Sequence, residues 1–219
     1  MHGKTGAIQI DWHDAPERIS SMLQTGEDPA VVCISGPVGS GKSTLAARLV
    51  RSVEHAALIA TDDYLPDYAS VPEAQRDLPG RAQLDELAGH VGLLKSGHPA
   101  TVPVWSFKSH SRVGNRKIEP ATLIVVEGIH ALHRKLDAVR SLGVLVTASP
   151  RLRWARWEVL ESSGQRGWGV DRARRFFETV ADPTFDRFRP HYLSRADIIV
   201  TNDDGIPDPF KAPEPRIPR

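Results

Sequence analysis

The sequence contains 219 residues, of which 40% are hydrophobic and 25% are charged, and its formal net charge is +1. This length and composition are typical of one sizeable α/β domain. The near-neutral charge argues against general binding to nucleic acids or membranes, and no apolar run approaches the roughly 18 residues that cross a bilayer. Because the first residues also lack a signal-peptide core, we expect a protein of the reducing cytoplasm, with its single Cys33 buried and unreactive.

Short apolar runs alternate with segments of helical periodicity along most of the chain. In chain order they predict a helix at 16–23, a strand at 30–35, a helix at 42–53, a strand at 56–60, a loop at 66–80, a helix at 84–94, strands at 101–107, 123–126 and 144–147, helices at 151–161 and 171–194, and a strand at 198–201. This alternation indicates an α/β fold with a mostly parallel sheet and right-handed crossovers. We assign five strands to that sheet. Residues 101–107 are instead expected to form a small hairpin with 117–119 across a turn at Gly114-Asn115.

A complete G-x-x-x-x-G-K-S motif follows the strand at 30–35 and opens the helix at 42–53. In such a loop the glycines let backbone N–H groups turn towards a β-phosphate, Lys42 reaches the β- and γ-phosphates, and the Ser43 hydroxyl binds Mg²⁺. A chain of this length would contain the motif by chance roughly once in a hundred. We therefore predict ATP and Mg²⁺ as cofactors. The predicted nucleotide-binding residues are Gly36, Pro37, Val38, Gly39, Ser40, Gly41, Lys42, Ser43 and Thr44.

Acidic residues end two of the predicted strands, at the edge where ligands bind to an open parallel sheet. Glu127 closes the apolar run at 123–126 and is predicted, with Ser43, to hold Mg²⁺ or its water shell. Asp62 and Asp63 directly follow the strand at 56–60, and a carboxylate there could accept the proton of an attacking hydroxyl. Each could instead cap a helix, and the residues alone do not separate the two.

From about Val31 to Asn202 the sequence resembles the uridine kinase-like family of P-loop kinases. Besides the P-loop, the resemblance rests on Thr61-Asp62-Asp63-Tyr64, Asp77-Leu78-Pro79, the stretch 103–112, Glu127-Gly128-Ile129-His130 and Ala196-Asp197-Ile198-Ile199-Val200. It implies a three-layer P-loop fold with a hairpin inserted at the acceptor site and a helical lid at about 151–175. It also implies transfer of the γ-phosphate of ATP to a hydroxyl of a nucleoside-like molecule, with uridine or cytidine as the first candidate.

The same resemblance suggests how the chain is organised. We expect one P-loop kinase domain over residues 1–206, followed by a proline-rich and disordered tail over 207–219. The expected partner is a small-molecule substrate, and neither a nucleic acid nor a membrane is expected to bind. Because uridine kinases often assemble into oligomers, the resemblance also leaves room for a homo-oligomer.

Individual roles also follow from the resemblance. Asp62 stands where the family has its catalytic base, the first acid after the second strand, and would also touch Mg²⁺. Asp77 stands where the family has a carboxylate that binds the ribose hydroxyls. The remaining positions of the expected substrate site, which include the base pocket, are Tyr64, Trp105, Phe107, His110 and Arg112. Two residues depart from the family near the base: Trp105 replaces a usual tyrosine and Arg76 an aromatic residue.

Segment 151–175 contains seven arginines together with Trp154, Trp157 and Trp168. Arginines and aromatic residues could form a nucleic-acid surface, but acidic residues interrupt the segment. It could also be a solvated helix with core tryptophans. Interpreted as a lid, it would close over ATP and bring Arg166, which lies beside flexible glycines, to the transferring phosphoryl group. Lys42, Asp62 and Arg166 are then the predicted catalytic residues.

Two further functions remain compatible with these motifs. One is a kinase for another hydroxylated metabolite, such as a ribosyl pyridine, a sugar phosphate or a pantothenate-like acid. The other is a nucleotide switch without a chemical acceptor. A GTPase should carry an Asn-Lys-x-Asp motif, which recognises guanine, after a late strand. The corresponding residues here, Thr201-Asn202-Asp203-Asp204, lack the lysine, which argues against a GTPase.

Overall fold

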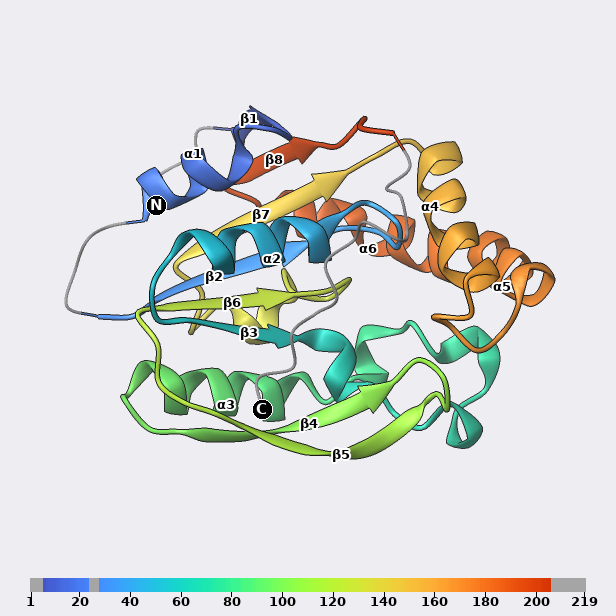
Figure 1. The fold of residues 1–219 in the computed structure, drawn as a ribbon, viewed down its shortest axis with the longest axis horizontal. Helices are drawn as coiled ribbons and strands as arrows, with labels where there is room; N and C mark the ends of the chain where they lie inside the picture. Colours follow the sequence, from blue (N-terminus) through green and yellow to red (C-terminus); the bar gives the residue numbers. More distant parts are fainter. Residues whose placement is uncertain (1–5, 24–27, 206–219) are drawn as a thin grey trace.

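The computed structural model describes residues 6–23 and 28–205, which form a central sheet, a separate hairpin and a group of helices at one end of the sheet (Figure 1). The strands are β1 (Ile8–Asp11), β2 (Ala30–Ser35), β3 (Ala56–Ala60), β4 (Ala100–Ser106), β5 (Ser111–Ile118), β6 (Leu123–Glu127), β7 (Leu142–Thr147) and β8 (Ile198–Thr201). The α-helices are α1 (Ala15–Met22), α2 (Lys42–Ser52), α3 (Leu84–Lys95), α4 (Pro150–Ser162), α5 (Val170–Phe176) and α6 (Asp182–Leu193). The tail predicted at 207–219 lies outside the described residues. Within the described part of the chain, every helix is too short or too polar to cross a membrane.

The central sheet consists of parallel strands in the order β1-β8-β7-β2-β6-β3. The α/β class is confirmed, but the sheet has six strands, so the predicted count of five is wrong. The additional strand is β1, which pairs with β8 and sets Ile8 opposite Ile198. It escaped prediction because it is four residues long and only Ile10 is buried. The carboxyl ends of the strands point towards α4 and α5, and β2 lies between β6 and β7 in the middle of the sheet (Figure 1).

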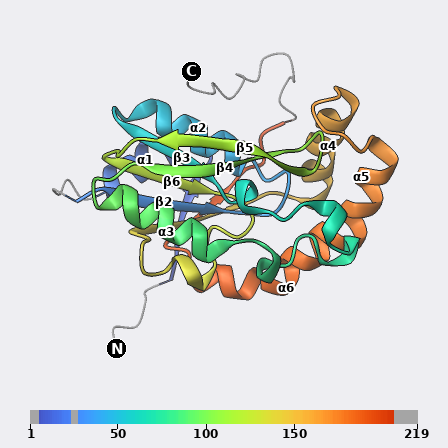
Figure 2. The ribbon, with the colours of Figure 1, turned by 90° about the horizontal axis from the view of Figure 1, so that it is seen from below.

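Helices cover both faces of the sheet because alternate side chains of a strand point to opposite sides. On one face, Val32 and Ile34 of β2 pack with Leu45 of α2 and with α1. On the other face, Val31 and Cys33 belong to the core that includes α3 and α6. In the view from below, α3 and α6 lie on this second side, and the hairpin lies in front of the sheet at its β3 edge (Figure 2). Cys33 is buried as predicted, and burial raises the pKa of its thiol to about 12.

The predicted hairpin is present, but its turn is not at Gly114-Asn115. Gly114 and Asn115 lie within β5, opposite Val104 and Pro103 of β4. The chain turns instead at residues 107–110, where His110 adopts a φ of 55°. Most of β5 is exposed and lacks hydrophobic alternation, so only its last residues could be recognised as a strand.

The helices beyond β7 form the segment predicted as a lid. Residues 163–169 join α4 to α5 at the predicted glycine-rich break, and α5 continues through a π-helical turn, Phe177–Ala181, into α6. Trp154 and Trp157 pack with Phe176 in a small core of their own. Two of the three tryptophans in this segment are therefore core residues, and the loop at 163–169 is the part that reaches towards the hairpin.

Candidate functional site

The loop between β2 and α2 has the backbone of a phosphate cradle. Gly39 and Gly41 have φ values of 75° and 96°, which residues with side chains rarely adopt. A Cβ atom at Gly41 would lie 2.1 Å from the Nδ2 atom of Asn202, and one at Gly39 would lie 2.3 Å from the carbonyl oxygen of Arg153. Gly41 is also the N-cap of α2, so the first N–H groups of that helix are available to an anion. The predicted motif therefore has the geometry of a phosphate site.

Arg156 and Asn202 hold the outer side of this loop, a role that the sequence did not reveal. Arg156 donates hydrogen bonds to the carbonyl oxygens of Gly39 (3.1 Å) and Ser40 (3.3 Å). Asn202 donates a third, from Nδ2 to the Ser40 oxygen at 2.8 Å. The C=O and N–H of a trans peptide point in opposite directions, so an outward Ser40 carbonyl turns the N–H of Gly41 towards the cradle. Arg156 thus supports the P-loop backbone.

Ser43, Glu127 and Lys42 meet where the cradle opens. The Ser43 hydroxyl donates a hydrogen bond of 3.0 Å to Oε2 of Glu127. Burial raises the pKa of Glu127, the positive charge of Lys42 opposes that shift, and the negative charge of Asp62 adds to it. Lys42 itself is buried, with 8% of its surface exposed. The structure therefore brings the predicted metal ligands Ser43, Glu127 and Asp62 together around the lysine.

The two adjacent aspartates have different surroundings. Oδ1 of Asp63 accepts a hydrogen bond from the backbone N–H of Trp105 at 3.1 Å, and Oδ2 lies 3.5 Å from Nη2 of Arg116. Burial raises the pKa of Asp63, and the hydrogen bond from Trp105 opposes this shift. Asp63 therefore fastens the hairpin to the turn after β3. Asp62 is close enough to Asp77 and Glu127 for its charge to raise both of their pKa values. The geometry favours Asp62 as the reactive carboxylate.

Asp77 is a buried carboxylate, 9% exposed, at the side of this centre. Burial, reinforced by the negative charge of Asp62, raises its pKa to about 7, although Lys42, Arg166 and Arg76 act in the opposite direction. Among the described residues, none donates a hydrogen bond to this carboxylate. Buried carboxylates normally have such donors, so Asp77 is suited to bind hydroxyl groups of a ligand.

Aromatic rings form a wall next to Asp77. The ring of His110 is stacked on Trp168 of the lid, with centroids 4.7 Å apart and an interplanar angle of 8°. The ring centroid of Tyr68 lies 5.5 Å from that of His110, 5.9 Å from that of Trp168 and 4.9 Å from that of Trp105. Burial raises the pKa of Tyr68, and the charges of Asp77 and Asp62 raise it further, so its phenol lies near both carboxylates. Tyr68 was missed because it lies in an irregular loop, where an aromatic residue nine positions before Asp77 was the only available signal.

Two predicted substrate residues lie apart from this wall. The hydroxyl of Tyr64 forms a 2.8 Å hydrogen bond with Nδ1 of His90 on α3, and its ring is buried in the core. Arg112 is bonded to Asn115 at 2.9 Å and lies 3.8 Å from Glu86 of α3. In this structure Tyr64 and Arg112 make structural contacts, and their substrate roles stay predictions. Their family motif places them near the acceptor in sequence, but the side chains point towards α3.

The arginines of the lid segment divide into groups with different contacts. Arg166 reaches the centre: its guanidinium carbon lies 3.6 Å from the ring centroid of Phe107. Burial lowers the pKa of Arg166, and the charges of Asp62 and Glu161 oppose this shift. Arg172 and Arg174 lie over the rings of Trp168 and Trp154 instead, at 5.0 and 4.8 Å. The three predicted catalytic residues, Lys42, Asp62 and Arg166, therefore lie near one another.

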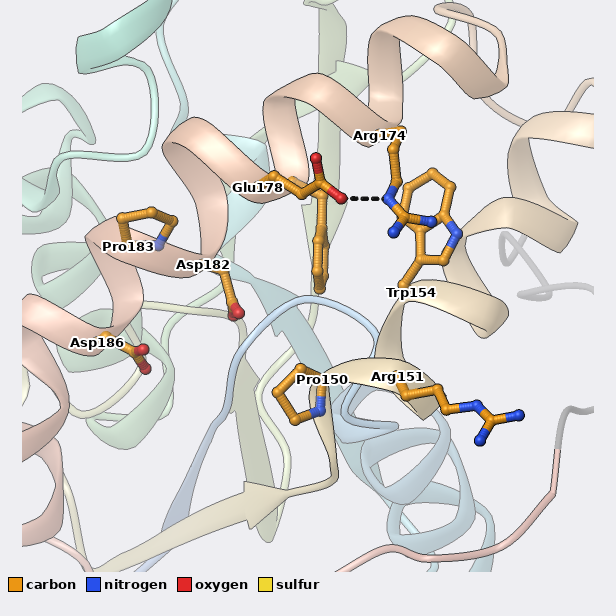
Figure 3. A pocket seen from close by; sticks show the side chains of 9 residues that line it. Pro150, Arg151, Trp154, Arg174, Glu178, Asp182, Pro183 and Asp186 are labelled. Atoms are coloured by element: carbon orange, nitrogen blue, oxygen red, sulfur yellow. Dashed lines mark hydrogen bonds and ion pairs between the residues drawn. The ribbon is translucent and has the colours of Figure 1, made fainter.

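Two cavities lie near the lid in the described part of the chain. One of about 310 Å³ is lined by Tyr68, His110 and Trp168, and it lies against the aromatic wall. The other, of about 610 Å³, lies beyond α4 and is bordered by Arg151, Trp154 and the acids of the α5–α6 segment (Figure 3). Those acids are paired with arginines: Glu178 with Arg174, Asp182 with Arg153 and Asp186 with Arg189. Of the predicted site residues, His110 borders the first cavity and none borders the second, so only the first adjoins the predicted acceptor side.

The residues present fit a magnesium nucleotide. The cradle has no room for side chains at Gly39 and Gly41, and the buried hydroxyl of Ser40 has no hydrogen-bond partner among the described residues. Hydroxyl and carboxylate oxygens, such as those of Ser43 and Glu127, are the ligands that Mg²⁺ prefers. A phosphate chain in the cradle would end close to Asp62 and Arg166. The arrangement is therefore equipped to transfer a terminal phosphoryl group.

Comparison with known proteins supports this geometry. Residues 31–204 match the model of the Phosphoribulokinase / Uridine kinase family. A uridine kinase from Clostridium botulinum is 30% identical over 181 residues, which cover 78% of this chain and 87% of that protein. The inorganic pyrophosphatase TTM2 of Arabidopsis thaliana is 32% identical over 194 residues, 88% of this chain. The chain spans only 28% of TTM2 and 20% of the related TTM1.

Solved structures share the fold at low sequence identity. A protein described as a possible uridine kinase from Bacillus stearothermophilus has a TM-score of 0.64 and 15% identity, covering 86% of this chain and 98% of its own. A D-glycerate 3-kinase from Cryptococcus neoformans has a TM-score of 0.54 and 15% identity, covering 80% and 85%. At such identities the likeness establishes a P-loop kinase fold and leaves the acceptor open.

Proposed function

The chain belongs to the phosphoribulokinase/uridine kinase family, and we propose that it transfers the γ-phosphate of ATP to a hydroxyl group of a nucleoside-like acceptor, with uridine or cytidine as the leading candidate. In this proposal residues 6–205 act as one kinase domain, the lid lies at about 151–175, and its moving part is the loop at 163–169. The acceptor is a small molecule.

The observation that carries the proposal is the position of Asp62. Its carboxylate is within electrostatic reach of Glu127 and Asp77, whose pKa values it raises, and of Arg166, whose pKa it also raises. It therefore lies near the predicted metal ligand, the predicted hydroxyl-binding acid and the lid arginine. A base at that point can accept a proton from an acceptor hydroxyl while the phosphoryl group is still held by the cradle.

The proposed reaction follows from these positions. The acceptor oxygen attacks the γ-phosphorus, its proton passes to Asp62, and the bond from the γ-phosphorus to the bridging oxygen of ADP breaks. Lys42 and Arg166 place positive charge near the equatorial oxygens of the transferring group. Mg²⁺, held by Ser43 and Glu127 when bound, would neutralise the β- and γ-phosphates. Arg156 would keep the P-loop N–H groups directed at them.

Asp77 and the aromatic wall support a nucleoside-like acceptor. A carboxylate without a protein donor can accept two hydroxyl hydrogens from a vicinal diol, as a ribose offers. Rings such as those of His110 and Trp105 can pack against a planar base. A ribosyl pyridine shares both features and is the first alternative. Sugar phosphates and pantothenate-like acids share only the hydroxyl groups.

An acceptor screen tests the proposal. ADP release from Mg·ATP would be followed by a coupled assay with ribonucleosides, ribosyl pyridines, pantothenate and sugar phosphates, each with and without protein. We expect a strong rise with at least one ribonucleoside. If ADP release increases only with a non-nucleoside, the protein is a kinase with a different acceptor. No rise with any acceptor would support a nucleotide switch. Phosphate release from inorganic pyrophosphate is measured separately, because the match to TTM2 covers most of this chain.

A further inference from the structure

The loop at 163–169 is folded around one buried carboxylate, that of Glu161 near the end of α4. Glu161 is 6% exposed. Its Oε1 accepts a hydrogen bond from Nε1 of Trp157 at 3.1 Å, and its Oε2 accepts two more, from the backbone N–H groups of Trp168 (3.2 Å) and Gly169 (3.0 Å). One side chain thus connects the fixed part of α4 to the far end of the loop.

The loop held in this way presents two functional side chains on either side of Gly167. Arg166 points to the phosphoryl site, over Phe107 and close to Asp62. Trp168 covers His110 on the acceptor side. Gly167 rests directly on the hairpin, because a Cβ there would lie 2.6 Å from the carbonyl oxygen of Lys108. The loop therefore cannot reach the acceptor wall without also bringing Arg166 to the reacting centre.

The base of the lid does not move with this loop. Arg153 in α4 is 1% exposed and pairs with Asp182 of α6 at 2.6 Å. Arg156 is bonded to the carbonyl oxygens of the P-loop. Because these contacts fix the first half of α4 to the nucleotide site, opening of the lid must occur beyond them, and Glu161 stands at that boundary.

We propose that Glu161 is a positioning residue that holds the lid loop so that Trp168 contacts the acceptor site and Arg166 the phosphoryl site at the same time. This inference rests on the proposed kinase function of the site. Acceptor binding against the wall that Trp168 covers would then favour the loop conformation in which Arg166 is ready for transfer. Without an acceptor the loop would open more readily, and transfer to water would stay slow.

A carboxylate is required at this position for a chemical reason. All three groups that surround it are N–H donors, so an ionised carboxyl group accepts every bond, while a glutamine must turn its own N–H₂ towards at least one of them. Glu161→Gln keeps the size of the side chain and the packing of α4. An unsatisfied donor costs enough to shift the loop equilibrium by about 10- to 100-fold.

The test compares Glu161→Gln with Glu158→Gln, a matched change on the same helix whose side chain holds no part of the loop. The first measurement is limited trypsin digestion of the full chain without ligands. Arg166 follows Gln165 in the loop, so release of the loop exposes the Arg166–Gly167 bond. We expect cleavage there to be about tenfold faster or more in Glu161→Gln, and unchanged in Glu158→Gln.

The second measurement is steady-state transfer to the acceptor that the wild-type protein uses best. Glu161→Gln should lower kcat by about tenfold or more, with a smaller change in the KM for ATP, and should raise the ratio of ADP released to phosphorylated product. Faster cleavage together with wild-type kinetics, or wild-type cleavage in Glu161→Gln, would overturn the inference. If the wild-type protein phosphorylates no acceptor, the proposed function fails, while the digestion result still decides whether Glu161 holds the loop.

Discussion

Replacement of Asp77 by asparagine should stabilise the ligand-free protein, and the gain should increase with pH. Burial and the neighbouring Asp62 raise the pKa of Asp77 from its ordinary 3.8 to about 7. Between these two values the folded protein binds more protons at this group than the unfolded chain does. Stability therefore falls as the pH rises from about 4 to about 7, because the folded state must give up a proton that it holds more tightly.

The magnitude follows from the two pKa values. For a group that titrates at 3.8 when unfolded and at about 7 when folded, linkage gives a cost of about 2 kcal/mol at pH 5 and about 4 kcal/mol at pH 8. The asparagine side chain of the variant does not titrate and has no such cost. The difference in unfolding free energy between variant and wild type should therefore grow by about 2 to 3 kcal/mol from pH 5 to pH 8.

Urea denaturation of both proteins at pH 5 and pH 8, without nucleotide, Mg²⁺ or acceptor, measures this difference. The charged groups around Asp77, which are Asp62, Lys42, Arg166 and Arg76, are common to both proteins, and their effects largely cancel. Asp171→Asn, at an exposed position of α5, is the control and should show no pH-dependent difference. A stability difference for Asp77→Asn that is constant between the two pH values would refute the description of Asp77 as a desolvated carboxylate without donors.

Three other outcomes are expected. Lys42→Ala should abolish phosphoryl transfer while the far-UV circular dichroism stays that of the folded protein; normal turnover would exclude the P-loop as the phosphate site. Ribonucleosides should be better substrates than their 2′-deoxy analogues by a factor of about 10² or more in kcat/KM, because a missing hydroxyl leaves Asp77 unpaired. Equal rates would show that the site does not recognise the diol. Arg166→Ala should lower kcat by about 10²-fold, with a smaller change in the dissociation constant for a non-hydrolysable ATP analogue. Arg166→Lys should retain only part of the wild-type kcat. Weaker binding of the analogue at unchanged kcat would mean that Arg166 binds ATP and does not act in transfer.

The nucleotide half of the site could be predicted from sequence because its parts are local. Gly36–Ser43 is one continuous motif, and the apolar runs before it and before Glu127 are buried parallel strands, which are recognisable without knowledge of their neighbours. Asp62 could be placed for the same reason, since a residue directly after a parallel strand must lie at the ligand edge. The pair Asp62 and Asp63 was not separable, because only the hairpin bonds of Asp63 distinguish them.

The acceptor half depends on contacts between distant segments, and the sequence pattern predicted less of it. Tyr68, His110 and Trp168 come from a loop, a hairpin turn and the lid, and none of them lies in a periodic element. Tyr64 and Arg112 belong to the same motifs as the other predicted site residues, yet in this structure their side chains contact α3. The exposed strand β5 and the short edge strand β1 show too few buried residues for periodicity to detect.

The most direct test of the kinase mechanism is transfer of label from γ-³²P-labelled ATP to a ribonucleoside by the wild-type protein, Asp62→Asn and Asp63→Asn. The wild-type protein should yield a labelled nucleoside monophosphate. Asp62→Asn should still bind Mg·ATP but form product at least about 10²-fold more slowly, the usual effect of losing a general base. Asp63→Asn should instead loosen the hairpin, with the smaller loss in turnover. Equal label transfer by Asp62→Asn and wild type, or a large loss in Asp63→Asn alone, would contradict the assignment of Asp62 as the base.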